Sequence, residues 1–292
     1  MRSVTSISYV LGMTETIARE RLLENLPVTE RRIELAGLST ALLEAGAGPP
    51  MVLLHGPGAH AAGWLPAIPA LAATHRVIAP DLPGHGATAV ADAPLDLARV
   101  LAWLDALIDR TCPTPPVLVG QLTGGAVAAR FAAQTPGRVR ALVLVVPFGL
   151  APFAPTPAFG SALTGYLSDP TGASHDTLWR HCVRDLDDVR FRLGDRWEAM
   201  RAYNLTLART PEVAGSLQQF LALFAAPAIP DDVLKRIAVP TTLVWGREDA
   251  IVPVSVGTAA AVRYGWPIHV LDTTGNEPAI EDPEAFVKAV TS

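Results

Sequence analysis

The sequence is poor in lysine, cysteine and long apolar runs. Lysine occurs only at Lys235 and Lys288, the net charge is −5, and there is no basic tract, so a nucleic-acid partner is not expected. The cysteines, Cys112 and Cys182, lie far apart and lack metal-ligand spacing, which favours reduced thiols. No run reaches the roughly 18 apolar residues of a membrane helix, and the N-terminus lacks a signal-like apolar segment. These absences predict a soluble, cytoplasmic protein with neither a membrane nor a nucleic-acid partner.

What the chain does contain is enough apolar sequence for a large core. Half of the residues are hydrophobic and 17% are charged, which suits an α/β domain of this length. Short apolar strands alternate with helical segments, and this alternation predicts a mostly parallel central sheet with helices on both faces. The strand signals are RRIELAG, STALLEAG, MVLLHG, RVIAPDL, PVLVG, RALVLVVPF, TTLVWG and PIHVLD, and helices are expected near 94–110 and 124–135.

The alternation of strands and helices breaks between about residues 148 and 235. A proline-rich link opens this stretch, and helical patterns then follow one another without a strand between them. We therefore predict three parts. These are an N-terminal extension (1–28), an α/β core formed by 29–147 and 236–292, and a helical lid (148–235) inserted between two strands of that core.

Several short motifs, taken in order, resemble those of the α/β-hydrolase family. The resemblance spans about residues 31–290, has the inserted lid in the family's usual place, and implies the α/β-hydrolase fold with a pocket between sheet edge and lid. The matching segments are LLHGPG (53–58) with Trp64 and APDLPGHGAT (79–88) for the oxyanion loop and next strand, VGQLTGG (119–125) for the nucleophile elbow, LVWGREDAIVP (243–253) for the acid turn, and TTGNEPAIEDPEAF (273–286) for the histidine loop.

Two of the catalytic positions implied by this resemblance carry residues unable to do the family's chemistry. Leu122 stands at the nucleophile position between Gly120 and Gly124, and leucine has no lone pair with which to attack. Asn276 stands at the histidine position and cannot shuttle a proton near neutral pH. Only Asp249, at the acid position, is retained. Loss of the triad as a unit costs on the order of 10⁶ in rate, so ordinary ester hydrolysis is not expected.

The neighbouring residues leave other chemistry open. Thr123 is an alternative nucleophile, although its place at a helix start suits a capping hydroxyl better. Pro57 has no N–H to offer an oxyanion, so Gly58 and Thr123 are the expected backbone donors. Without a histidine partner, burial should raise the pKa of Asp249 toward neutrality, which suits a general acid or base.

The predicted site therefore combines an apolar pocket with a few polar groups. The catalytic candidates are Asp249, Asn276 and Thr123. No cofactor motif is visible, because the two Gly-x-Gly fragments (56–58 and 84–86) lack the spacing of a dinucleotide-binding motif. No cluster of metal-ligating residues is visible in the sequence either. The expected partner is a small-molecule substrate, and the oligomeric state stays open. The candidates for substrate binding are Pro57, Gly58, His60, Gln121, Leu122, Trp179 and His181.

Three functional hypotheses follow from these residues. The first is a non-hydrolytic lyase or cyclase that catalyses an elimination, dehydration, cyclisation or pericyclic step on an apolar, carbonyl-bearing secondary metabolite such as a polyketide intermediate in antibiotic biosynthesis. The second is a small-molecule-binding protein without catalysis. The third is an atypical hydrolase that uses Thr123 or a bound water as nucleophile.

Overall fold

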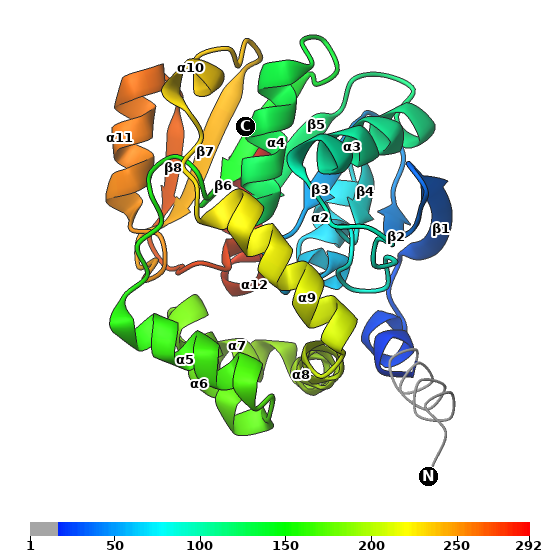
Figure 1. The fold of residues 1–292 in the computed structure, drawn as a ribbon, viewed down its shortest axis with the longest axis vertical. Helices are drawn as coiled ribbons and strands as arrows, with labels where there is room; N and C mark the ends of the chain where they lie inside the picture. Colours follow the sequence, from blue (N-terminus) through cyan, green and yellow to red (C-terminus); the bar gives the residue numbers. More distant parts are fainter. Residues whose placement is uncertain (1–16) are drawn as a thin grey trace.

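The computed structural model describes residues 17–292 and contains one eight-stranded sheet (Figure 1). The strand order is β1-β2-β4-β3-β5-β6-β7-β8; β2 pairs antiparallel with β1 and β4, and β3 to β8 are parallel to one another. All predicted strands are present, which confirms the mostly parallel sheet. They are β1 (Thr29–Leu35), β2 (Leu38–Ala45), β3 (Pro50–Leu54), β4 (Arg76–Pro80), β5 (Val117–Gln121), β6 (Ala141–Val145), β7 (Thr241–Gly246) and β8 (Ile268–Leu271).

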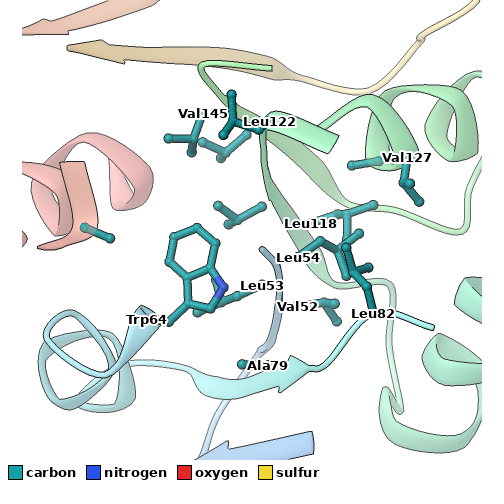
Figure 2. Close-up of a cluster of buried hydrophobic side chains, with 14 of the residues drawn as sticks. Val52, Leu53, Leu54, Trp64, Ala79, Leu82, Leu118, Leu122, Val127 and Val145 are labelled. Atoms are coloured by element: carbon teal, nitrogen blue, oxygen red, sulfur yellow. The ribbon is translucent and has the colours of Figure 1, made fainter. Parts of the chain in front are cut away.

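Two groups of helices cover the sheet. In the first, α4 (Leu122–Gln134) packs on β5 and β6, and α3 (Leu97–Thr111) packs on α4. In the second, α2 (Ile68–Ala72) and α13 (Pro283–Thr291) pack on each other and on β4, β7 and β8. A further helix, α11 (Val254–Tyr264), packs on β7 and β8 without packing on α2 or α13 within the described residues. The inner strands are apolar and buried along almost their whole length, as strands covered on both faces must be. Figure 2 shows part of this core.

Most of the chain between β6 and β7 forms a separate helical layer, drawn below the sheet in Figure 1, whereas its last helix, α10 (Asp231–Leu234), packs on α4. We call residues 148–235 the lid segment because they lie over the cavity described below. From this layer α9 runs back toward α4. The segment contains α5 (Pro157–Ser168), α6 (Gly172–Cys182), α7 (Leu186–Leu193), α8 (Asp195–Ala208), α9 (Pro211–Phe220), a π-helical turn (Leu221–Ala225) and α10 (Asp231–Leu234).

The predicted N-terminal extension is described only from residue 17, and residues 1–16 lie outside the described part of the chain. Residues 17–23 are helical. Leu22 and Arg19 on this helix are only 3% and 5% exposed, so the helix is packed onto the rest of the protein. Among residues 17–292, none of the helices has the length and apolar character needed to cross a membrane.

Candidate functional site

The turn from β5 into α4 keeps the backbone of a nucleophile elbow but carries leucine. Leu122 has a φ of 47°, a left-handed value that costs a non-glycine residue about 1–2 kcal/mol. The flanking glycines are sterically required, because a β-carbon at Gly120 would lie 2.5 Å from the carbonyl oxygen of Gly124, and one at Gly124 would clash with the carbonyl oxygen of Leu54. The strained turn persists although the side chain that it presents cannot attack a carbonyl.

The Leu122 side chain lies beside the loop expected to hold an oxyanion. It is 5% exposed, and its Cδ1 would be 3.1 Å from a β-carbon placed on Gly56. Pro57, which follows Gly56 in this loop, has no N–H to donate to an oxyanion. Figure 2 shows Leu122 within the buried apolar cluster that includes Trp64 and Val145. The elbow therefore presents an apolar surface to the cavity.

Asp249 and Asn276, at the other two triad positions, bind each other. Asn276 Nδ2 donates to Asp249 Oδ2 at 2.8 Å, while Asp249 Oδ1 accepts from the amides of Ile251 and Val252 at 2.8 and 2.9 Å. The Asn276 amide donates to the carbonyl oxygen of Cys182 at 2.8 Å. Asn276 Oδ1 is buried and finds no hydrogen-bond partner within residues 17–292. Asparagine thus receives the support that a histidine would receive, but it cannot relay a proton.

Asp249 does not contact the cavity directly, contrary to the sequence-based expectation. Burial raises the pKa of Asp249 to about 6, although hydrogen bonds from Val252, Asn276 and Ile251 oppose that rise. Both carboxylate oxygens are engaged by those donors, and Asn276 and Ile251 line the cavity in front of it. Asp249 can therefore act on a ligand only by positioning Asn276.

A cavity that is partly open to solvent lies between the sheet edge and the lid segment; its volume is about 1120 Å³ when the solvent space at its mouth is included. Its wall is mostly apolar and comes from both parts of the chain. The core supplies Pro57, Gly58, His60, Trp64, Gln121, Leu122, Ile251, Asn276, Glu277 and Ile280 among others, and the lid segment supplies Phe148, Phe153, Phe159, Leu163, Tyr166, Leu167, Leu178, Trp179, Cys182, Met200, Asn204, Leu217 and Leu221.

The structure brings seven of the ten predicted site residues to this wall; besides Asp249, the exceptions are Thr123 and His181. Thr123 is fully buried in α4, past the N-cap position, so the predictions that it faces the pocket and that its hydroxyl caps the helix are both wrong. His181 does not line the cavity, since its ring packs edge-on to Phe159 with centroids 6.3 Å apart. The residues that do line it are Pro57, Gly58, His60, Gln121, Leu122, Trp179 and Asn276.

Neither of the other candidate nucleophiles beside the elbow is suited to attack. The Thr123 hydroxyl is enclosed, with 0% of the residue exposed. Cys182 lines the cavity, but burial and then the charges of Glu277 and Asp249 raise the pKa of its thiol well above the ordinary value. Because the thiolate is the reactive form of cysteine, this thiol is inert near neutral pH.

Glu277 is the candidate that the sequence motifs did not indicate. Its carboxyl lines the cavity one residue after Asn276, and Oε2 accepts a hydrogen bond from Gln121 Nε2 at 3.0 Å. Gln121 Nε2 also donates to the carbonyl oxygen of Asn276 at 2.9 Å, which fixes the amide between the two. Burial raises the pKa of Glu277 to about 8, against the Gln121 hydrogen bond. A carboxyl that titrates near neutral pH in an apolar cavity is suited to proton transfer.

A second carboxylate holds the loop that carries Glu277. Glu281 accepts from the amide of Gly275 at 2.9 and 3.0 Å, from that of Glu277 at 3.1 Å and from that of Arg184 in the lid segment at 2.7 Å. This carboxylate is engaged by backbone donors and has a structural role. Across residues 17–292, no group of histidine, cysteine or acidic side chains is arranged to hold a metal ion.

Glu277→Gln is expected to stabilise the protein more at pH 9 than at pH 5. The folded protein keeps the Glu277 proton up to about pH 8, whereas the unfolded chain releases it near the ordinary value of 4.5. The natural chain therefore loses stability as pH rises through this window, and glutamine has no proton to lose. We expect a difference of about 2–4 kcal/mol, at about 1.4 kcal/mol per pKa unit.

Urea unfolding of both proteins at pH 5, 7 and 9 measures this difference. The comparison between proteins is needed because burial lowers the pKa of His55, His60 and His175 to about 4, which makes stability rise with pH in both proteins. A constant gap across the three pH values would show that Glu277 does not hold its proton on folding.

Comparison with known proteins gives consistent matches. The model of the Alpha/beta hydrolase family matches residues 51–289. The 2-hydroxymuconate semialdehyde hydrolase of Pseudomonas sp. (strain CF600) is 30% identical over 293 residues, covering 91% of this chain and 94% of that protein. The dihydrolipoyllysine-residue acetyltransferase component of an acetoin cleaving system from Pseudomonas putida is 33% identical over 231 residues, covering 77% of this chain and 59% of that protein. A solved 2-hydroxy-6-oxo-6-phenylhexa-2,4-dienoate hydrolase from Rhodococcus sp. strain RHA1 superposes with a TM-score of 0.77 at 27% identity, covering 89% of this chain and 95% of that one.

Proposed function

The chain belongs to the Alpha/beta hydrolase family, and on that premise we propose that it is a member that transfers protons instead of forming an acyl-enzyme. Its reaction is that of a lyase or cyclase on an apolar, carbonyl-bearing metabolite, of which polyketide intermediates are one class. The observation that carries this proposal is the Glu277 carboxyl, which lines an apolar cavity beside an elbow that has lost its nucleophile.

Proton transfer needs a base of suitable pKa and a substrate held against it. In the dehydration of a β-hydroxyketone, the Glu277 carboxylate takes the proton from the carbon next to the carbonyl group. The carboxylic acid so formed then gives that proton to the leaving hydroxyl, which departs as water, and the carboxylate is regenerated. The pKa of about 8 suits both steps, because the group is neither too weak a base nor too weak an acid near neutral pH.

The apolar wall and the names of the relatives support the substrate class. Leu122, Phe148 and Trp179 are among the side chains that would contact an apolar body. The name of one relative denotes a semialdehyde substrate, and the name of the solved relative an oxo acid, so both proteins act on carbonyl compounds. Those relatives are named hydrolases; the loss of serine and histidine at the triad positions is what leads us to a different reaction here.

The test uses 5-nitrobenzisoxazole, whose ring opens when a base removes its C–H proton and whose product absorbs visible light. The natural chain should open the ring with a rate that rises through pH 8, as the Glu277 carboxylate forms. Glu277→Gln should lower kcat/KM about 100-fold, which is the low end of the usual contribution of a general base. Glu248→Gln is the matched control, because that side chain is 52% exposed.

Three results would count against the proposal. An unchanged rate in Glu277→Gln would remove this carboxylate as the base. A fluorophosphonate adduct on the natural chain, mapped to Thr123 together with turnover of a nitrophenyl ester, would mean that the protein is a hydrolase. Saturable binding of 5-nitrobenzisoxazole without ring opening would favour the alternative that the protein binds a small molecule without catalysis.

A further inference from the structure

The amide group of Gln121 is committed as a hydrogen-bond donor toward the loop that carries Glu277. Its Nε2 atom donates to the carbonyl oxygen of Asn276 at 2.9 Å and to Glu277 Oε2 at 3.0 Å, so both amide hydrogens are used. The reversed amide would place Oε1 against the Asn276 carbonyl oxygen, where two acceptors would repel each other. The hydrogen-bond pattern therefore fixes which end of the amide meets Glu277.

The backbone on both sides of this amide is held in place. Gln121 is the last residue of β5, pairs with Val145 of β6 and stands at the N-cap position of α4. It is 5% exposed, which leaves its side chain little freedom. The loop that it contacts is held in turn by Glu281, which accepts from the amides of Gly275 and Glu277. Gln121 thus ties the Glu277 carboxyl to a rigid strand end.

The two oxygens of Glu277 have different surroundings. Oε2 accepts from Gln121, which is the one hydrogen bond to this carboxyl within residues 17–292. Oε1 has no partner in the same range, yet it is not enclosed. The enclosed side-chain oxygens without a partner are Thr123 Oγ1, Thr274 Oγ1 and Asn276 Oδ1.

The accessible surface of Glu277 belongs to the cavity. Burial is the main cause of its raised pKa, so the carboxyl lies deep in the protein. The residue is nevertheless partly exposed, and it lines the cavity between the core and the lid segment. A molecule in the cavity can therefore reach Oε1, the oxygen that no protein donor occupies.

The other two carboxyl groups of this region leave no oxygen over. Those of Asp249 accept from two backbone amides and from Asn276. Those of Glu281 accept from three backbone amides, each oxygen at least twice. Among these three carboxyl groups, only that of Glu277 is held at one oxygen and open at the other.

We propose that Gln121 is the positioning residue of the base: it holds Oε2 of Glu277 and leaves Oε1 as the atom that takes the substrate proton and returns it. As the O–H bond forms at Oε1, the C–H bond breaks and its electron pair passes into the carbonyl group. The same proton then leaves Oε1 with the departing hydroxyl as water. This inference rests on the proposed function, because it assigns the atom and the support of the base in that reaction.

The Gln121 hydrogen bond also has an electrostatic effect. An N–H donor stabilises a carboxylate more than a carboxylic acid, so it lowers the pKa of Glu277 and opposes burial. The charges of Glu281 and Asp249 act in the opposite sense and raise that pKa. Loss of the Gln121 donor should therefore leave a carboxyl that ionises only at higher pH.

The other titratable groups around Glu277 do not mask this change. The pKa of Asp249 is about 6, and the pKa values of two cavity histidines are about 4, so all three titrate below the pH at which Glu277 ionises. The cavity thiol and phenol have raised pKa values and stay neutral through this range. These groups are Asp249, His55, His60, Cys182 and Tyr166.

Gln121→Met, which is similar in size and has no N–H, tests the proposal in the ring opening of 5-nitrobenzisoxazole. The natural chain should show a midpoint near pH 8 in kcat/KM. In the variant we expect this midpoint about one pH unit higher and, at pH 7, a rate about 10-fold lower, because about a tenth as much carboxylate is present. Gln219→Met is the matched control, since it removes a glutamine hydrogen bond, to the Leu95 amide, away from the cavity.

Carbon-13 NMR of protein labelled at the glutamate carboxyl carbons measures the same property without turnover. The signal that is missing in Glu277→Gln belongs to Glu277, and its titration should move upward in Gln121→Met by the same amount as the kinetic midpoint. Gln121→Asn is the second variant if the methionine protein does not fold. It keeps the amide but is one methylene shorter, so it cannot bond both partners, and the same upward direction is expected.

Three outcomes would overturn the inference. They are a midpoint that stays in place or falls in the Gln121 variants, a rate that drops equally at every pH without a change of midpoint, or an equal shift in Gln219→Met. Failure of the proposed function is a separate result, since it is an unchanged rate of ring opening in Glu277→Gln. In that case the NMR titration still decides whether Gln121 holds the Glu277 carboxyl.

Discussion

Replacing Leu122 by serine and Asn276 by histidine together should make the protein react covalently with a fluorophosphonate, about 10³-fold faster than either single variant. The serine alone would have no base, and the histidine alone would have no nucleophile to activate. Because triad members act as a unit, the gain should appear only in the double variant.

The structure already holds the supports that these two residues need. Leu122 keeps the left-handed backbone of the elbow, with a φ of 47°, so a serine there would be presented by the same turn. Asn276 Nδ2 donates to Asp249 Oδ2 at 2.8 Å. The Nδ1 atom of a histidine occupies nearly the same position relative to the backbone as Nδ2 of asparagine. Asp249 would therefore orient the new imidazole and stabilise its charged form.

The matched control is the double variant Leu122→Ser with Asn276→Gln, in which residue 276 is similar in size to histidine but relays no proton. Intact mass measured over time after probe addition gives the labelling rates. Ester turnover should stay about 10²–10³-fold below that of a complete site, because Pro57 still withholds one oxyanion donor. If the Ser/His variant labels no faster than the Ser/Gln control, the elbow does not bring residues 122 and 276 into reach of each other.

Arg19→Ala should lower the free energy of unfolding by about 3–5 kcal/mol, the usual effect of removing one partner from a buried ion pair. Arg19 Nη1 lies 2.9 Å from Asp81 Oδ2 and donates to the Tyr203 hydroxyl at 3.1 Å, while Nε lies 2.7 Å from Glu30 Oε1. Asp81 is fully buried. Burial alone would favour its protonated form, but Arg19 contributes most to holding the pKa of Asp81 below its ordinary value.

A double-mutant cycle separates this ion pair from general packing. Asp81→Asn removes the charge that Arg19→Ala would leave uncompensated, so the double variant should be less destabilised than the sum of the single variants. Urea unfolding gives the four free energies, and Arg21→Ala, an exposed position on the same helical segment, is the control. Additive effects, or a loss in Arg19→Ala no larger than in the control, would show that the pair does not hold this helix to the core.

The strands and the elbow could be predicted because their signals are local. The inner strands need near-continuous apolar runs, and the elbow needs Gly120 and Gly124 at fixed spacing because any β-carbon there would meet the backbone. The absence of a nucleophile is likewise visible from Leu122 alone. These requirements are imposed by covalent geometry and by burial on both faces of the sheet, so each leaves its mark at a single stretch of sequence.

The carboxyl that we propose as the base could not be assigned in this way. The sequence analysis favoured Asp249, which matches the acid motif, but its oxygens are occupied by Ile251, Val252 and Asn276. Glu277 stands at a position that the histidine-loop motif leaves free, and the only local signal is that the residue is acidic. Its pKa and its access to the cavity depend on burial and on Gln121, which is 156 positions away in sequence.

The sequence by itself determined that this is a mostly parallel α/β protein whose elbow carries no nucleophile. Hydrophobic pattern, glycine spacing and residue identity can each be read from a short stretch of sequence. Only the tertiary structure decided which polar groups face the cavity and in which form. The Gln121–Glu277 and His60–Asn204 hydrogen bonds and the Arg19–Asp81 ion pair each join segments far apart in the chain. The protonation of a buried group is set by the partners and the dielectric around it, and those exist only once the chain has folded.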